Sequence, residues 1–244
     1  MILRRLPGSR FSEVLRAWEG ETAVLLGGGP SLTQEQVETV RQAHQEGRCR
    51  TIAVNDAYLL AQWADVCYFA DSKWWNWQIA GVAKPTIGLT GDEVRQRFWS
   101  FAGQKCSIQA SGGNITDEAV HIMRNRDYPV HGNVLSDDSH FLATGRNSSY
   151  QALNLAILAG AKTVILLGVD GQKSPDGKTH WHGSHERPTP EGAYAAYRRA
   201  FSEAAQAVAA AGVRVINASP SSAVGFERMD IADALMLAHN DEAE

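Results

Sequence analysis

Short apolar segments alternate along this chain with longer segments in which apolar residues recur at helical spacing. The strand-like segments are residues 23–26, 51–54, 66–70, 163–167 and 213–216, with 85–89 and 105–109 as further candidates. The first helix-like segment begins after Thr33. The others are residues 58–64, 148–158, about 190–211 and 230–237. Strands that alternate with helices are typical of a parallel sheet covered by helices. We therefore predict an α/β fold for residues 1–244, a single Rossmann-like domain with a doubly wound, mostly parallel sheet and helices on both faces.

Local signals mark the ends of several helices. Thr33 and Gln36 form a capping-box pattern at the start of the first helix. Thr189 and Pro190 are typical of an N-cap and a first helical position. Residues 110–143 have weak periodicity and many Gly, Asn, Asp and His residues, so we expect an irregular insertion or lid there.

The composition narrows the classes of partner. A net charge of −4 gives no support to nucleic-acid binding, because nucleic-acid-binding domains are usually basic. The cysteines Cys49, Cys67 and Cys106 are scattered, which favours a reducing compartment over a disulfide framework. No apolar run is long enough for a membrane span, and the first residues lack the pattern of a signal peptide. We expect a cytoplasmic protein that acts on a small molecule, and a homo-oligomer stays open.

Residues 23–32, Ala-Val-Leu-Leu-Gly-Gly-Gly-Pro-Ser-Leu, form the most informative motif. An apolar strand ends at Gly27, Gly28 and Gly29, and a helix-like segment follows Ser31. Such a turn presents backbone N–H groups to an anion, and glycine allows a phosphate to approach closely. The pattern is neither Gly-x-Gly-x-x-Gly nor a Walker loop. The motif predicts phosphate or nucleotide binding, and a glycine-rich turn without a ligand is the alternative.

Polar residues or glycines end each of five predicted strands. They are residues 27–29, Asn55 with Asp56, Asp71, Gly168 with Asp170, and residues 217–219. In doubly wound sheets ligands bind beyond the carboxyl ends of the strands, so these residues would converge on one site. Loops are polar in any case, which is the alternative explanation.

A second helix start, Thr-Gly-Arg-Asn-Ser-Ser at residues 144–149, offers further polar groups. The planar guanidinium of Arg146 suits a phosphate or a carboxylate. Asn147 and Ser148 suit plain helix capping equally well.

Three histidines, His180, His182 and His185, lie close together in a loop that follows a predicted strand end. Imidazoles suit general acid–base chemistry near neutral pH. No Asp or Glu spacing completes a known zinc pattern, so we assign no metal ligands. A metal site and a surface cluster without a role are the alternatives.

A tryptophan-rich segment follows Asp71. Trp74, Trp75 and Trp77 offer indoles on which a base or a sugar could stack. Tryptophans this close together belong more often to a core or an interface, and we favour that interpretation.

The motifs, taken in order, resemble those of two related groups of proteins. They are residues 27–32, Asn55, the helix start at 144–149, Leu-Leu-Gly-Val-Asp at 166–170, and His180, Gly183 and His185. One group is the bacterial sialyltransferases that use CMP-sialic acid, whose first strand ends in Gly-Asn-Gly-Pro-Ser-Leu and whose late histidine acts as a base. The other contains motility accessory factors and archaeal 6-hydroxymethylpterin diphosphokinases. Rossmann-like proteins of unknown function from bacteriophages are more similar still, with a Thr-His-Trp-x-Gly-x-His run and an ending like residues 217–220.

The resemblance implies a transferase, similar to glycosyltransferases, that binds a nucleotide or nucleotide-sugar, with a CMP-type ligand favoured. The binding residues that it implies, together with the strand-end argument, are Gly27, Gly28, Gly29, Ser31, Asn55, Asp71, Arg146, Asn147, Ser148 and Asp170. Amides of the glycine turn would hold phosphates, Asn55 would contact the ribose or base, and Arg146 a further phosphate or a sugar carboxylate. His185, or else His180, would deprotonate an acceptor hydroxyl, and His182 is not favoured.

The chain also departs from the sialyltransferase pattern. Gly28 stands where that family has an asparagine, Ser184 stands where it has its histidine, and residues 171–179 contain no tyrosine. One alternative is a pterin or nucleotide diphosphokinase that needs Mg²⁺, with Asp71 or Asp170 as a metal-binding carboxylate. The other is a non-catalytic phage accessory protein that binds a nucleotide in the host cytoplasm.

Overall fold

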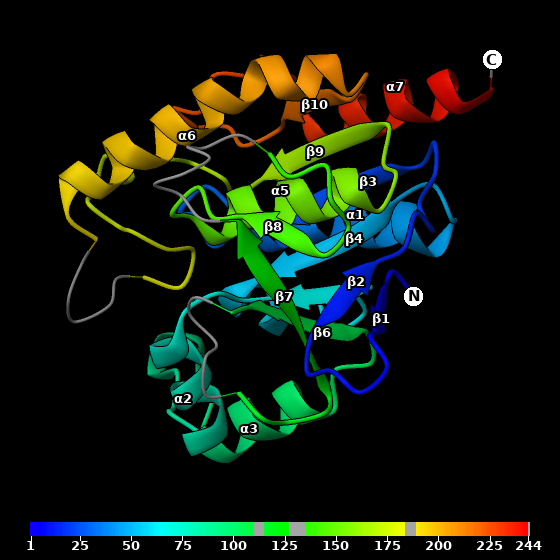
Figure 1. Ribbon diagram of the computed structural model, residues 1–244. Helices are drawn as coiled ribbons and strands as arrows, with labels where there is room; N and C mark the ends of the chain where they lie inside the picture. The colour runs from blue at the N-terminus through cyan, green and yellow to red at the C-terminus, as the bar shows by residue number, and fades with distance from the viewer. Residues whose placement is uncertain (110–114, 127–134, 184–188, 244) are drawn as a thin grey trace.

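The computed structural model describes residues 1–109, 115–126, 135–183 and 189–243. Its centre is a sheet whose strands, among these residues, lie in the order β11-β10-β9-β3-β4-β5-β6-β7-β8 (Figure 1). The strands are β3 (Thr22–Leu26), β4 (Arg50–Val54), β5 (Val66–Tyr68), β6 (Gln104–Ile108), β7 (Val120–Arg126), β8 (Phe141–Ala143), β9 (Thr163–Leu167), β10 (Arg214–Asn217) and β11 (Glu227–Arg228). All neighbouring strands of this sheet run parallel.

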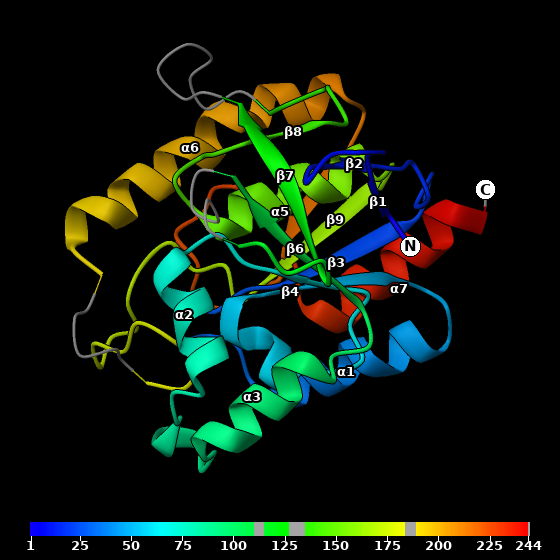
Figure 2. The same cartoon turned by 60° about the horizontal axis from the view of Figure 1, so that its bottom comes forward.

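Helices cover both faces of the sheet, so the fold is the doubly wound, Rossmann-like α/β arrangement that the sequence predicts. The helices α5 (Ser148–Leu158) and α6 (Glu191–Ala210) share one core with the sheet, and α1 (Gln34–Gln45) and α7 (Ile231–Ala243) share the other. Figure 2 shows α1 beside α7. The second core also takes in α2 (Ser72–Ala80), α3 (Gly91–Trp99) and the 3₁₀ helix η1 (Asn55–Leu59). Within the described residues no helix is both long and apolar enough to cross a membrane.

The strands β3 and β9 form the buried centre of the sheet. Every residue of both strands is buried. Their side chains alternate between the cores, with Leu25 and Val164 entering the core of α5 and α6 while Val24 and Ile165 enter the core of α1 and α7. A strand that is covered on both faces needs a continuous apolar run, which is why these two strands are visible in the sequence.

The order of the strands reverses between β3 and β9. From β3 the chain adds β4 to β8 on one side, and it then returns through α5 to place β9 on the other side of β3. In such sheets the crevice beyond the carboxyl ends of the strands at this reversal is the usual ligand site. The loops after Leu26 and after Leu167 therefore meet at the position where the fold favours binding.

Within residues 110–143, the described parts, 115–126 and 135–143, contain regular strands where we expected an irregular insertion or lid. Among the described residues this stretch contains β7 and β8, which extend the sheet. An N-terminal hairpin of β1 (Leu3–Arg5) and β2 (Ser12–Val14), also missed, packs against β7. The strand β7 reads Val-His-Ile-Met-Arg-Asn-Arg, and its polar second half hides the strand pattern.

Three further elements differ from the sequence prediction. Residues 85–89 hold a short 3₁₀ helix, η2 (Pro85–Ile87), instead of a strand, because Pro85 cannot donate to a ladder and suits a first helical position. The helix expected over 58–64 is the earlier 3₁₀ helix η1. Pro190, and not Thr189, is the N-cap of α6.

Candidate functional site

The glycine turn lies against the loop that follows β9. Gly27 N–H donates to Leu167 O at 2.7 Å, and Gly29 N–H donates to Gly168 O at 2.8 Å. A Cβ at Gly27 would lie 2.3 Å from Gly168 O, and a Cβ at Gly29 would lie 2.3 Å from Asp170 Oδ2. Close packing of the two loops therefore explains the glycines at 27 and 29 without a ligand.

Asp170 links these two loops. Its carboxylate accepts the Ser31 N–H at 2.9 Å and the Ser31 hydroxyl at 2.5 Å, and the residue is 3% exposed. Burial raises the pKa of Asp170, against the opposing effect of the two hydrogen bonds from Ser31. The N–H groups of Gly29 and Ser31, which we expected to hold a phosphate, thus donate to acceptors of the protein itself.

Gly28 differs from its two neighbours. A Cβ at this position would be 3.6 Å from His180 Nδ1, which is an ordinary contact. Packing therefore does not require a glycine at position 28. The carbonyl of Gly28 accepts hydrogen bonds from the histidine loop.

The described part of the histidine loop is a tight turn that rests on the glycine turn. His180 N–H donates to Gly183 O at 2.9 Å, and Gly183 N–H donates back to His180 O at 3.0 Å. Trp181 N–H lies 3.3 Å from Gly28 O, and His180 Nδ1 lies 3.2 Å from the same oxygen. A carbonyl oxygen only accepts, so Nδ1 of His180 carries the hydrogen, and Nε2 of the neutral ring carries the lone pair. The predicted meeting of the two motifs therefore holds for His180, while His185 lies outside the described residues.

Asp56 is the centre of a buried charged cluster beside this turn. Its carboxylate accepts from Lys84 Nζ at 2.6 Å, from Trp74 Nε1 at 2.8 Å and from His182 Nε2 at 3.1 Å. The side chains of Asp56, Lys84 and His182 are 5%, 8% and 7% exposed. Burial acts to raise the pKa of Asp56, but the contacts with His182 and Lys84 outweigh it and hold that pKa well below its usual range.

Sequence reasoning missed this cluster, which we name the Asp56 cluster. His182 was not favoured, yet its ring stacks on that of His180 with centroids 5.4 Å apart and an interplanar angle of 5°. Lys84 carried no motif at all. The available signal was the pair Asn55-Asp56 at a strand end, where a carboxylate directly after a buried strand needs a partner.

Asn55 and Arg146 occupy unusual backbone positions at this edge of the sheet. Asn55 follows β4 with φ of 51°, and Arg146 lies in the loop before α5 with φ of 55°. Gly145 precedes Arg146 with φ of 49°, and Asn147 N–H reaches Thr144 O at 3.3 Å. Two consecutive residues with positive φ and this hydrogen bond match a type I′ turn, which presents the exposed Arg146 at its tip.

Three other predicted residues lie at helix starts. Asp71 is the N-cap of α2 and accepts from Lys73 N–H at 2.7 Å. Asn147 is the N-cap of α5, where its Oδ1 accepts the N–H groups of Ser149 and Tyr150 at 2.8 and 3.1 Å. Ser148 is the first residue of α5. The capping alternative therefore describes Asn147 in this structure, and Asp71 is also a cap, a role that we did not predict from the sequence.

The tryptophans after Asp71 are mainly core residues. Trp74 and Trp75 are 4% and 8% exposed, and Phe69 stacks on Trp75 at 5.7 Å with an interplanar angle of 5°. The favoured core interpretation is confirmed for these two residues. Trp77 contacts Lys73, whose Nζ lies 4.8 Å from the ring centroid.

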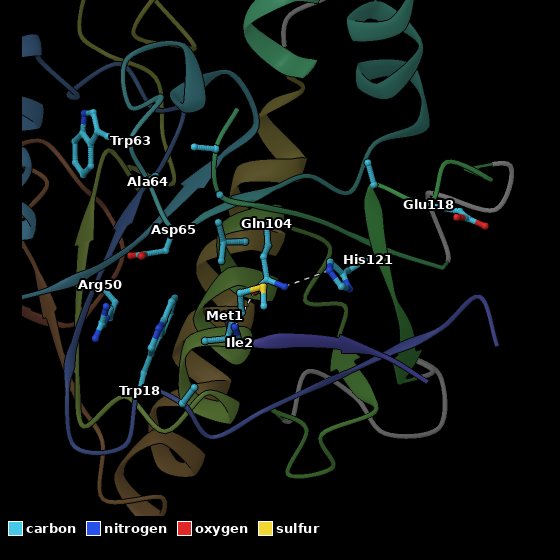
Figure 3. Close-up of a pocket in the computed structure, with 15 residues that line it drawn as sticks. Met1, Ile2, Trp18, Arg50, Trp63, Ala64, Asp65, Gln104, Glu118 and His121 are labelled. Carbon is cyan, nitrogen blue, oxygen red and sulfur yellow. Dashed lines mark hydrogen bonds between the residues drawn. The ribbon is translucent and has the colours of Figure 1, made fainter. Parts of the chain in front are cut away.

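A separate cavity of about 590 Å³ lies at the opposite edge of the sheet (Figure 3). It is lined by the starts of β4, β5 and β6 and by His121, which Figure 3 shows beside Gln104. Gln104 Oε1 accepts from Ile2 N–H at 2.7 Å, so its amide nitrogen faces His121 Nε2 at 3.2 Å, and His121 Nδ1 meets the Ser12 hydroxyl at 2.9 Å. These bonds attach the N-terminal hairpin to the sheet. This edge holds the amino ends of the strands, where the fold does not favour a ligand site.

Comparisons with known proteins give no family to which this site could be referred. No family model, curated protein or solved structure matches the chain. Within the described residues no group of three or more His, Cys, Asp or Glu side chains is placed to hold a metal ion. The site is therefore described by its own chemistry, which is the glycine turn, His180 and the Asp56 cluster.

Proposed function

We propose that the protein is a transferase that binds a nucleotide or nucleotide-sugar at the carboxyl edge of its sheet, with His180 as the general base. One observation carries this proposal: His180 Nδ1 hydrogen-bonds to the carbonyl of Gly28, in the turn at the reversal of strand order. That bond fixes the tautomer whose Nε2 accepts a proton. The order of motifs that resembles the CMP-sialic-acid-dependent enzymes supports the nucleotide-sugar part of the proposal.

The proposed reaction is a displacement at the anomeric carbon of the sugar. The O–H bond of an acceptor breaks, and its proton moves to Nε2 of His180 while the oxygen forms a bond to the anomeric carbon. The bond from that carbon to the phosphate oxygen breaks, and its electron pair leaves with the nucleotide. Neutral imidazole has a reference pKa of about 6.5, which suits proton transfer at neutral pH.

The phosphate is assigned to the Arg146 loop and not to Ser31. Asp170 already accepts from Ser31, and a second anion beside that carboxylate would be repelled. Arg146 is exposed at the tip of its turn, immediately before the positive end of the α5 dipole. A bond from Tyr68 OH to Gln151 Oε1 at 2.9 Å attaches the first turns of α5 to the end of β5. The loop thus belongs to the same edge of the sheet.

The Mg²⁺-dependent diphosphokinase is the weaker alternative on this geometry. The carboxylate of Asp170 accepts hydrogen bonds from Ser31, and the carboxylate of Asp71 caps α2. Each carboxylate would have to leave its present partner to bind a cation.

A thermal-shift panel tests the proposal. CMP or a CMP-sugar should raise the melting temperature without added metal. Stabilisation by ATP only in the presence of Mg²⁺ would favour the diphosphokinase, and no response to any nucleotide would contradict nucleotide binding.

His180→Gln tests the role of the base. It should leave nucleotide affinity within about tenfold, because a neutral hydrogen bond contributes only about 0.5–1.5 kcal/mol, and it should lower turnover of a CMP-sugar by about 10²- to 10⁴-fold. His44→Gln, at the opposite edge of the sheet, is the matched control and should change neither. Unchanged turnover in His180→Gln would remove His180 as the base.

A further inference from the structure

A group of buried polar atoms around the histidine turn has no hydrogen-bond partner. Asn55 Oδ1, Thr179 Oγ1 and Trp181 Nε1 are all closed off from solvent and unpaired in the part of the chain that the structure describes. Thr179 as a whole is only 4% exposed. Buried polar groups are paired in the large majority of cases, so unpaired ones on two adjoining loops need an explanation.

The residues that carry these atoms adjoin those of the site proposed above. Thr179 and Trp181 flank His180, which is bonded to Gly28, and Asn55 precedes Asp56, which is bonded to His182. The unpaired atoms thus come from two loops that the same contacts join. Their position at the carboxyl edge of the sheet agrees with a binding subsite.

The chemistry of the three atoms selects a class of ligand group. Asn55 Oδ1 accepts, Trp181 Nε1 donates, and the Thr179 hydroxyl does both. None of them carries a charge, so together they suit a neutral group. An ionised phosphate oxygen only accepts and would be repelled by Asn55 Oδ1, whereas a hydroxyl both donates and accepts and can turn to suit each partner.

We infer that Thr179, Trp181 and Asn55 form a subsite for the hydroxyl groups of the ligand's ribose. This inference rests on the proposed nucleotide binding and names the part of the nucleotide that this edge recognises. Because the atoms are closed off in this structure, the side chains of Thr179 and Trp181 have to turn as the ribose enters, while the bond from His180 to Gly28 is kept. The unpaired atoms then acquire the partners that they lack.

The test compares ribose and dideoxyribose ligands on matched threonine variants. Thr179→Val removes an unpaired hydroxyl, whereas Thr51→Val removes a hydroxyl that is equally buried but bonded to Asp65 at 3.1 Å. Calorimetric titration uses the common ribonucleoside 5′-monophosphates and their 2′,3′-dideoxy counterparts. Thermal unfolding of each variant is measured without ligand.

Wild type should bind a ribonucleotide about 3- to 10-fold more tightly than its dideoxy counterpart, the effect of one neutral hydrogen bond. Thr179→Val should lose that preference while it melts at or above the wild-type temperature. Thr51→Val should melt lower and keep the preference. Trp181→Phe, which retains an aromatic ring without Nε1, should weaken ribonucleotide binding in the same way as Thr179→Val.

Other outcomes separate this inference from the proposed function. Equal binding of ribo- and dideoxynucleotides by wild type would overturn the ribose subsite and leave nucleotide binding standing. A full preference in Thr179→Val, or a melting temperature as low as that of Thr51→Val, would also overturn it. Absence of any nucleotide binding by wild type would overturn both proposals.

Discussion

Removal of the positive charge of Lys84 is the most direct test of the Asp56 cluster. Lys84 Nζ lies 2.6 Å from Asp56 Oδ2, and both side chains are almost fully buried. With an effective dielectric constant of about 20, two unit charges at this separation attract by about 6 kcal/mol. Transfer of each ion from water costs several kcal/mol, so the net contribution of the pair is small although each charge depends on the other.

We expect Lys84→Met to lower the free energy of unfolding by about 3–5 kcal/mol, because Asp56 then stays buried without its counter-ion. Asp56→Asn should cost a similar amount, since Lys84 loses its counter-ion and His182 and Trp74 lose a charged acceptor. The double variant should lose clearly less free energy of unfolding than the two single losses added together, because neither charge of the pair remains.

Urea unfolding at pH 7, followed by tryptophan fluorescence, measures these changes for both single variants and the double variant. Arg16→Met is the control, since the pair of Arg16 and Glu19 is well exposed and should leave the midpoint of unfolding unchanged. The reasoning fails if Lys84→Met unfolds at the wild-type midpoint, or if the two losses simply add in the double variant.

Three further substitutions test other parts of the structure. Gly28→Ala should fold as wild type does, whereas Gly29→Ala should melt at a lower temperature because its Cβ would collide with Asp170; equal melting temperatures would contradict the packing argument. Burial, with the charge of Arg5 nearby, lowers the pKa of His121, so between that lowered pKa and about pH 6.5 the unfolded chain binds more protons than the folded chain. The stability of wild type relative to His121→Gln should therefore rise as the pH increases through this range. A difference between these proteins that does not change with pH would refute that assignment. Asn147→Ala removes the cap of α5 and should cost about 0.5–2 kcal/mol in urea unfolding, and a loss of nucleotide affinity at unchanged stability would instead make Asn147 a ligand contact.

The elements that could be predicted are those whose signal lies in neighbouring residues of the sequence. The strands β3 and β9 are buried on both faces, and burial leaves a continuous apolar run in the sequence. The helix α1 has a capping box in which Thr33 and Gln36 bond reciprocally, as the sequence predicts. In each case the signal is local, because neighbouring residues carry the whole pattern.

The strand β7 shows why other elements could not be predicted. Its later residues include Arg124, Asn125 and Arg126, which suggest a loop when they are considered alone. In the structure the guanidinium of Arg124 lies over the Phe11 ring, 4.9 Å from its centroid, and Phe11 comes from the N-terminal hairpin. The backbone of Arg124–Arg126 pairs with Phe141–Ala143, and Phe11 is more than a hundred positions away, so the local sequence contains neither partner.

The candidate site was predictable in position and only partly in composition. The meeting of the glycine turn with His180 follows from the rule that strand ends at one edge converge, and the structure places these residues in contact. The Asp56 cluster does not follow from that rule. Lys84 belongs to the loop after α2, and only the three-dimensional path of that loop brings its ammonium group to Asp56.

Asp170 explains how a motif that resembles an anion site can be complete without an anion from outside. The backbone N–H groups after β3 need acceptors, and physical chemistry does not distinguish a phosphate oxygen from a carboxylate oxygen on the next strand. Here the carboxylate of Asp170 meets both donors of Ser31. A phosphate at this position would have to displace the carboxylate of Asp170, which belongs to the same chain and is already buried. Binding is therefore easier for a ligand that leaves this contact intact and uses polar groups that lack a partner, such as those of Thr179 and Trp181 on either side of His180.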